Sequence, residues 1–316
     1  MVVQQRVWFV TLASGTETAG APLSEHPAGA GAPVQFCRLP GGDSPLDAGI
    51  ERARRLGTDA RHVLFLRPAH DAFWNAEKLT IGPKIVYESE HRGSGASVLA
   101  ALSHLVQIDA AATLVVQPAH LAVEHEQPLE AALLRAVRRA NLGDNRLILL
   151  SLADDGPRGG WTPPILDDRH PADTPWPLGP QPITDGPVPA RVLRRDSGFV
   201  VGRASAFVRA FDRAARRLLY QFLAAARSRP GHVPDPCDVV PPGVEALDLA
   251  RHVLPCTPGL LRFQTVRACG ALDLRDQAEV LGRLRRAQAS AGEPRRRPHF
   301  PAVQHAPVTR VGGGSR

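Results

Sequence analysis

Lysine is almost absent from this chain of 316 residues. Only Lys78 and Lys84 are lysines among the 38 basic residues, and the others are arginine. Together with 30 prolines and 28 glycines, this preference for arginine over lysine indicates a bias of genome composition as much as a function. Five arginines and no acidic residue follow residue 293, so most of the net charge of +7 belongs to the end of the chain. We therefore expect no nucleic-acid partner for the rest of the protein.

Paired cysteines and long hydrophobic runs are also missing. The four cysteines (Cys37, Cys237, Cys256 and Cys269) lie far apart without a C-x-x-C pair, which excludes a zinc ribbon and a disulfide framework. No run approaches the roughly 18 apolar residues of a membrane-spanning helix, so no membrane span is expected. Residues 1–10 lack the pattern of a secretory signal. A cytoplasmic location is the resulting expectation.

The first half of the sequence alternates short apolar runs with amphipathic segments. Strands are predicted at residues 7–13, 62–66, 84–87, 112–116 and 146–150, and helices at 44–56, 94–108 and 129–140. Strands that alternate with helices over short connections are typical of a mostly parallel sheet covered on both faces. The fold class predicted is therefore α/β, with a doubly wound sheet.

The second half is less regular. Residues 154–189 are rich in proline and glycine and are predicted to form an excursion over a binding cleft. A strand at 198–201, helices at 205–226, 244–254 and 275–287, and an extended segment at 261–269 are expected around the rest of the fold. We expect one domain over residues 1–292 and a disordered basic tail over residues 293–316.

Seven segments, in order, resemble motifs of the mannose-1-phosphate guanylyltransferases. Residues 12–24 (LASGTETAGAPLS) are similar to the opening L-A-G-G-S-G-T-R-L-W-P-L-S, and residues 33–36 (PVQF) are similar to P-K-Q-F. The other segments are residues 91–96 (HRGSGA) at N-R-[NG]-T-A-P, 115–120 (VVQPAH) at V-L-P-[SA]-D-H, 160–161 (GW) at Y-G-[YW]-I, 197–199 (SGF) at N-S-G-[IF], and 270–274 (GALDL) at G-W-S-D-[LV]-G. Their order and spacing make a chance match improbable.

The resemblance implies a nucleotidyltransferase (GT-A-like) fold that binds a nucleoside triphosphate such as GTP over the first glycine loop. It also implies Mg²⁺ as cofactor and transfer of the nucleotide to a sugar 1-phosphate, a reaction that depends on positioning and charge neutralisation. The matching positions imply nucleotide contacts at Ala13, Ser14, Gly15, Thr16, Arg92, Gly93 and His120, sugar contacts at Gly160, Trp161, Ser197 and Gly198, and a metal-binding carboxylate at Asp273.

Three charged groups of the family pattern are missing from this sequence. The loop arginine of the family falls on Ala19, the lysine of P-K-Q-F falls on Val34, and the first metal-binding aspartate falls on Ala119. Glu17 replaces a loop glycine and would place a negative charge beside the triphosphate. Loss of one preorganised charged group typically costs about 10²- to 10³-fold in rate. We therefore expect a divergent member with weak or lost catalysis, no assigned catalytic residue, and a residual nucleotide or nucleotide-sugar site with a regulatory role.

Two other interpretations stay open at this point. One is an active enzyme in which Arg38, Arg92 or Lys84 supplies the missing positive charge. The other is a structural or interaction protein without a ligand, which acts through a protein partner or a homo-oligomer.

Overall fold

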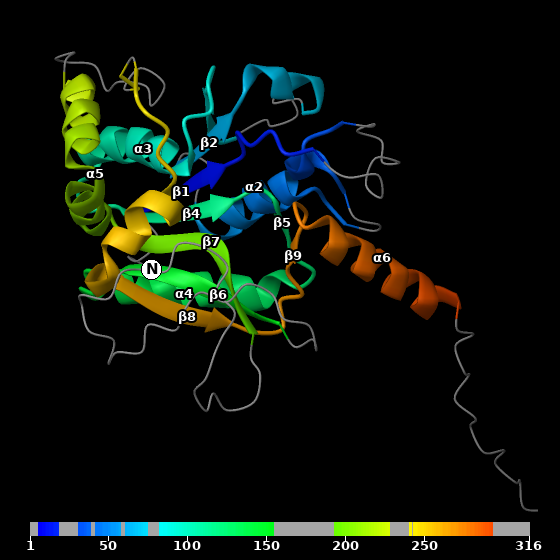
Figure 1. Ribbon diagram of the computed structural model, residues 1–316. Helices are drawn as coiled ribbons and strands as arrows, with labels where there is room; N and C mark the ends of the chain where they lie inside the picture. Colours follow the sequence, from blue (N-terminus) through cyan, green and yellow to red (C-terminus); the bar gives the residue numbers. More distant parts are fainter. Residues whose placement is uncertain are drawn as a thin grey trace, which may run out of the picture.

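A seven-stranded sheet forms the centre of the computed structural model, which describes residues 6–18, 31–38, 42–57, 61–74, 82–154, 193–227, 240–241 and 243–292. The strand order is β3-β2-β1-β4-β7-β6-β8, and only β7 runs antiparallel to its neighbours (Figure 1). The strands are β1 (Val7–Leu12), β2 (His62–Leu66), β3 (Lys84–Tyr87), β4 (Thr113–Pro118), β6 (Leu147–Asp154), β7 (Leu193–Arg203) and β8 (Leu261–Val266). The doubly wound, mostly parallel sheet predicted from the sequence is confirmed.

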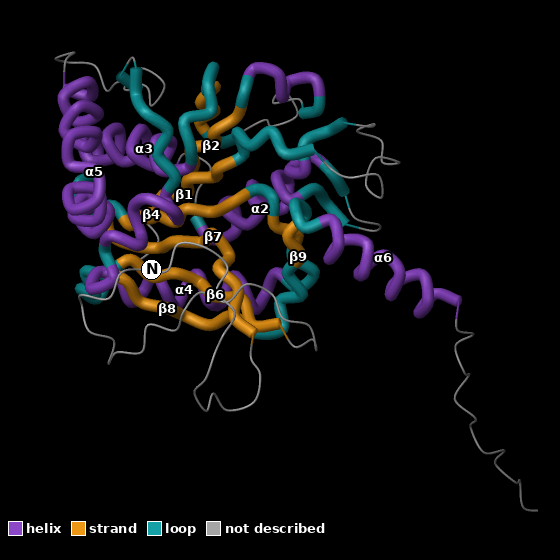
Figure 2. Tube along the Cα trace, in the orientation of Figure 1, coloured by secondary structure: helices purple, strands orange, loops and turns teal. Residues whose placement is uncertain are grey.

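Two helices cover each face of this sheet (Figure 2). Helices α3 (Ser94–Ile108) and α5 (Ala204–Arg227) pack on one face, and α2 (Pro45–Leu56) and α4 (Glu126–Asn141) pack on the other. Successive side chains of a strand point to opposite faces, so each strand contributes to both cores. In β1, Val10 belongs to the core under α3 and α5, whereas Phe9 belongs to the core under α2 and α4.

The sequence patterns located these helices closely because their caps and their apolar spacing agree. Ser44 caps α2 by accepting a hydrogen bond from the backbone N–H of Asp47 at 3.1 Å, and Pro45 occupies the first helical position. Ser94, by contrast, is the first residue of α3 rather than its cap, which is Gly93. Among the described residues, no helix is both long enough and apolar enough to cross a bilayer.

The prediction of a helix at residues 244–254 is wrong. Instead of a helix, this segment has an irregular stretch up to Asp248, a π-helical turn at Leu249–Val253 and a 3₁₀ turn at Leu254–Cys256. The reason is that the backbone of Leu247 bonds to α3 and to Arg92, instead of to its own segment. A two-stranded sheet of β5 (Leu121–Ala122) and β9 (Leu272–Asp273) and helix α6 (Gln277–Gly292) complete the described fold. The predicted excursion after Asp154 and the predicted tail lie outside the described residues.

A buried chain of polar side chains ties α2 and α4 to the sheet. Arg52 of α2, only 1% exposed, donates to both carboxylate oxygens of Glu126 at 2.7 and 2.8 Å and to Oε1 of Gln117 at 3.0 Å. Gln117 on β4 donates in turn to the hydroxyl of Thr11 at 2.7 Å, and this hydroxyl lies 2.7 Å from Nε2 of His62. Since the Thr11 hydroxyl accepts from Gln117, its own hydrogen can be donated to His62, which is then neutral.

Burial lowers the pKa of His62 to about 3. The unfolded chain binds a proton at this histidine below its ordinary pKa of 6.5, whereas the folded protein does not until about pH 3. The unfolded state therefore binds more protons across this window, and the free energy of unfolding falls as the pH falls from 6.5 towards 3. We expect His62→Gln to reduce the slope of unfolding free energy against pH by about 1.4 kcal/mol per pH unit, measured by urea unfolding between pH 4.5 and 6. His125→Gln, at an exposed position, is the matched control and should leave the slope unchanged.

Candidate functional site

The loop that follows β1 lies among the carboxyl ends of β1, β2 and β4. The backbone N–H of Ala13 donates to the carbonyl oxygen of Phe65 at 3.0 Å, and that of Ala119 donates to the carbonyl oxygen of Leu12 at 3.2 Å. In an α/β sheet, ligands bind at this edge, because the loops after the parallel strands leave a crevice there. Of the loop residues predicted to contact a nucleotide, Ala13 and Ser14 are buried, Gly15 is half-buried and Thr16 is exposed.

Gln35 fixes the backbone of this loop. Its side-chain amide is 2% exposed and donates to the carbonyl oxygens of both Ala13 and Gly15, each at 2.8 Å. The backbone N–H of Val34 also donates to the carbonyl oxygen of Glu17 at 2.9 Å. Sequence reasoning concentrated on the missing lysine of this segment and missed Gln35. The glutamine in the matching motif was the signal that could have identified it.

The carboxylate of Glu17 lies directly over the glycine loop. A Cβ atom added to Gly15 would lie 2.5 Å from Oε2 of Glu17, which means that this carboxylate occupies the space above the Gly15 backbone. The negative charge of Glu17 acts on two histidines of this edge, because it tends to raise the pKa of both His91 and His120. A negatively charged side chain therefore stands where the resemblance would place a triphosphate.

Two of the three positions that lack the family's charged groups lie within hydrophobic clusters. Val34 is 1% exposed and packs in a cluster with Cys37 and Leu272. Ala119 is also 1% exposed and packs in a cluster with Phe36 and Leu64. These substitutions are part of continuous apolar packing, so a lysine or an aspartate at either position would be buried among apolar groups. Ala19, the third position, lies outside the described residues.

Asp273 is bound by an arginine of its own chain. The Arg275 guanidinium donates to one carboxylate oxygen of Asp273 at 3.0 Å and to the other at 2.8 Å, and the Arg275 backbone N–H adds a third bond at 3.0 Å. Burial alone would raise the pKa of Asp273, but the Arg275 hydrogen bonds and the nearby His120 hold it below its ordinary value. Arg275 thus supplies the positive charge beside this carboxylate.

The pKa values of the two histidines at this edge are shifted in opposite directions. Burial, followed by the charge of Arg275, lowers the pKa of His120 to about 4, so its ring is neutral at pH 7. The carboxylate of Glu88, 3.8 Å from Nδ1 of His91, raises the pKa of His91 above its ordinary value, although burial opposes the shift. Nδ1 of His91 also lies 3.2 Å from the hydroxyl of Ser14, which links the loop after β1 to the turn before α3.

Arg92 and Gly93 contact the chain itself. Arg92 donates to the carbonyl oxygen of Val244 at 2.7 Å and to Glu90 at 2.8 Å. Gly93 has a φ of +85°, and the backbone of Leu247 lies so close to it that a Cβ would collide with the Leu247 carbonyl oxygen. The same oxygen accepts hydrogen bonds from the backbone N–H groups of Gly95 and Ala96, so the first free N–H groups of α3 are already satisfied.

The structure describes only some of the residues predicted to contact a sugar. Gly198 on β7 has a φ of +71°, and the Pro118 ring lies 3.3 Å from the place of a Cβ, so glycine is required there for two reasons. Ser197 belongs to the same strand, but its side chain lies outside the described residues. Gly160 and Trp161 lie outside them as well. The structure therefore brings Gly198 to the carboxyl end of β4 and leaves the rest of this subsite as a prediction.

The residues at this edge do not fit Mg²⁺. Octahedral Mg²⁺ takes oxygen ligands and usually at least one carboxylate free to bind it. Here both oxygens of Asp273 already bind Arg275 and Ala119 offers no ligand atom, so neither position gives the Glu17 carboxylate a second carboxylate with which to bind the ion. Throughout the described ranges, no group of three or more histidine, cysteine, aspartate or glutamate side chains is arranged to hold a metal ion.

Comparison with solved structures finds proteins that have the same fold. One similar structure is the mannose-1-phosphate geranyltransferase from Thermus thermophilus, with a TM-score of 0.60 and 19% identity over 86% of this chain and 77% of that one. Another is the mannose-6-phosphate isomerase from Helicobacter pylori, with a TM-score of 0.54 and 13% identity over 85% of this chain and 100% of that one. The chain shares their fold. No protein-family model and no curated protein matches the sequence.

Proposed function

We propose that this protein is a divergent sugar-1-phosphate nucleotidyltransferase, similar to the mannose-1-phosphate guanylyltransferases, with weak or lost nucleotidyl transfer. It binds a nucleotide or a nucleotide sugar at the carboxyl edge of the sheet and acts through that binding, on a protein partner or on a second copy of itself. We also propose that it works in the cytoplasm. The observation that carries this proposal is the Glu17 carboxylate over Gly15, next to the closed Asp273–Arg275 pair.

The binding half of the proposal rests on the preserved loop. Gln35 holds the carbonyl groups of Ala13 and Gly15, which keeps the loop after β1 in a fixed shape at the edge where α/β proteins bind ligands. The likeness in fold to a structure named for mannose 1-phosphate supports a sugar-phosphate or nucleotide-sugar ligand. An interaction protein without any ligand would not need this loop to be held by a buried amide.

The catalytic half rests on charge. Transfer to a sugar phosphate requires the negative charge of the triphosphate to be neutralised. Val34 and Ala119 contribute no charge, Glu17 adds a negative one, and Arg275 is paired with Asp273. Losses of this kind at groups that act together are not additive, but each alone typically costs about 10²- to 10³-fold.

A rebuilt active site is less well supported, because the three alternative cations lie elsewhere or are engaged. Arg38 pairs with Asp47 at 3.3 Å, and Arg92 bonds to Val244 and Glu90. Lys84 is the first residue of β3, which places it at the amino end of the parallel strands, opposite to the loop after β1.

The proposal predicts binding without turnover. Calorimetry should detect GTP and GDP-mannose with affinities that do not depend on Mg²⁺, and a pyrophosphate-release assay with GTP and mannose 1-phosphate should show no turnover. In the same calorimetry, Glu17→Gln should bind GTP about tenfold more tightly, since a unit charge at about 4 Å contributes about 1 to 4 kcal/mol at the effective dielectric constants of a protein surface.

The control for this variant is Asp212→Asn on α5, which removes one negative charge that pairs with Arg216 and should leave GTP affinity unchanged. Rapid pyrophosphate release by the wild-type protein would overturn the loss of catalysis. If neither the wild type nor Glu17→Gln bound GTP or GDP-mannose, the interaction-protein alternative would replace the proposal.

A further inference from the structure

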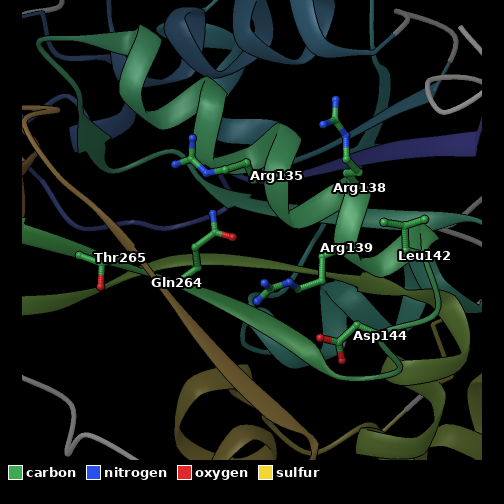
Figure 3. A pocket seen from close by; sticks show the side chains of 7 residues that line it. All are labelled: Arg135, Arg138, Arg139, Leu142, Asp144, Gln264 and Thr265. Carbon is green, nitrogen blue, oxygen red and sulfur yellow. The ribbon is translucent and has the colours of Figure 1, made fainter.

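A second concave site lies between α4 and the edge strand β8, away from the loop after β1. It is a pocket of about 610 Å³, within the size range of small-molecule sites. Gln264 on β8 donates to the carbonyl oxygen of Ala132 on α4 at 2.7 Å, and this bond holds the strand against the helix. The lining residues are Arg135, Arg138, Arg139, Leu142, Asp144, Gln264 and Thr265 (Figure 3).

Three of these residues are arginines from successive turns of α4. Arg135, Arg138 and Arg139 lie on the second half of the helix, and Figure 3 shows all three extending from it. Residues spaced three and four apart lie next to one another on a helix, so these like charges repel each other. None of the three forms an ion pair within the part of the chain that the structure describes.

The acids of α4 cannot neutralise these arginines, because they are paired with α2. Glu126 binds Arg52, and Glu130 binds Arg55 at 2.6 Å. Both acids belong to the first half of α4, whereas the arginines belong to the second half. The helix therefore has one end with balanced charges and one end with unbalanced positive charge.

The single acid in the pocket wall is already neutralised by other arginines. One carboxylate oxygen of Asp144 accepts from Arg146 at 3.1 Å, and the other accepts from Arg262 at 2.8 Å. The charge of Asp144 is therefore taken up by Arg146 and Arg262, and the three lining arginines of α4 leave the pocket with an excess of positive charge. The hydroxyl of Thr265 adds a neutral donor to the wall.

We propose that this pocket binds a small phosphorylated molecule with at least two phosphate groups. Guanidinium groups bind phosphate oxygens through two parallel hydrogen bonds, and arginines one turn apart can engage adjacent phosphates. Helix α4 starts near the carboxyl edge of the sheet and runs away from it, so Arg135, Arg138 and Arg139 lie towards the opposite edge. The pocket is therefore a site separate from the loop after β1, and it does not depend on the function proposed above.

Calorimetry of the full chain with inorganic pyrophosphate tests this proposal. We expect saturable binding to the wild type that weakens as salt is raised from about 50 to about 300 mM, because exposed charges are screened. Arg135→Gln with Arg139→Gln should weaken binding at least fivefold. The lysine pair, Arg135→Lys with Arg139→Lys, keeps the charge but loses the paired donors, and it should bind with intermediate affinity.

The matched control is Arg213→Gln with Arg217→Gln on α5, which removes the same charge from another helix, at two positions that flank the kink at Ala215. This control should bind pyrophosphate like the wild type. Equal weakening in both double variants would mean that only the net charge matters and would overturn the proposal, as would the absence of saturable binding to the wild type. A thermal unfolding scan of each variant without pyrophosphate confirms that the fold is kept.

Discussion

Arg52→Ala is expected to lower the free energy of unfolding by about 3 to 5 kcal/mol. The guanidinium is buried and makes two bonds to Glu126 and one to Gln117, so its removal leaves a partly buried carboxylate and a buried amide oxygen without their partner. The ring of Phe199, which lies 5.4 Å from the guanidinium carbon, also loses a cation above its face. Urea unfolding followed by circular dichroism at pH 7 measures the change.

Arg55→Ala is the matched control for this prediction. Arg55 lies one turn nearer the end of α2 and pairs with Glu130 of the same partner helix, but its side chain is 40% exposed. Surface ion pairs contribute about 0 to 1 kcal/mol, so this variant should be nearly as stable as the wild type. Equal losses in the two variants would mean that the buried bridge contributes no more than a surface pair.

Gly93→Ala is expected to cost about 2 to 4 kcal/mol of stability, for two reasons. The φ of +85° with a ψ of 158° is a conformation that only glycine adopts readily, and the new Cβ would collide with the backbone of Leu247. The collision would push Leu247 away from the first turn of α3. The backbone N–H groups of Gly95 and Ala96 would then lose their acceptor, the carbonyl oxygen of Leu247. Thermal and urea unfolding both report this loss.

Gly143→Ala separates the two causes. Gly143 has a φ of +102°, but a Cβ there would have no heavy atom within 4 Å. Only the backbone conformation is then unfavourable, and we expect a loss of about 1 kcal/mol. If Gly93→Ala cost no more than Gly143→Ala, the close approach of Leu247 to α3 would not contribute to stability.

Sequence periodicity predicted the regular elements of the sheet and its covering helices, because each is determined by its own residues. Strand β1 and helix α3 have the apolar spacing of a buried strand and an amphipathic helix, and they form where that spacing indicated. The segment at 244–254 has helical spacing too, yet the backbone of Leu247 is bound to Arg92 and α3. A tertiary contact of this kind cannot be seen in a local pattern.

The sequence predicted the missing charged groups of the candidate site better than it predicted the side-chain contacts that are present there. Motif alignment identified Val34 and Ala119 as missing charged groups, and both positions prove to be apolar packing. The pairing of Asp273 with Arg275 requires side-chain geometry, although the two-residue spacing was visible. The arginine pocket had only a short signal, the basic residues of the helix predicted at 129–140. Its depth comes from β8, which lies far from α4 in the sequence and was not expected beside it.

The pair formed by Asp273 and Arg275 has a consequence for how this edge of the sheet responds to its surroundings. The cation that faces the carboxylate is covalently attached two residues away, so it competes for the oxygens at an effective concentration in the millimolar range, whatever the solution contains. A free cation gains the carboxylate only when its concentration, relative to its own affinity, exceeds that of the tethered guanidinium. The charge at this edge is therefore set first by the chain, and a cation from the medium must displace Arg275 to change it.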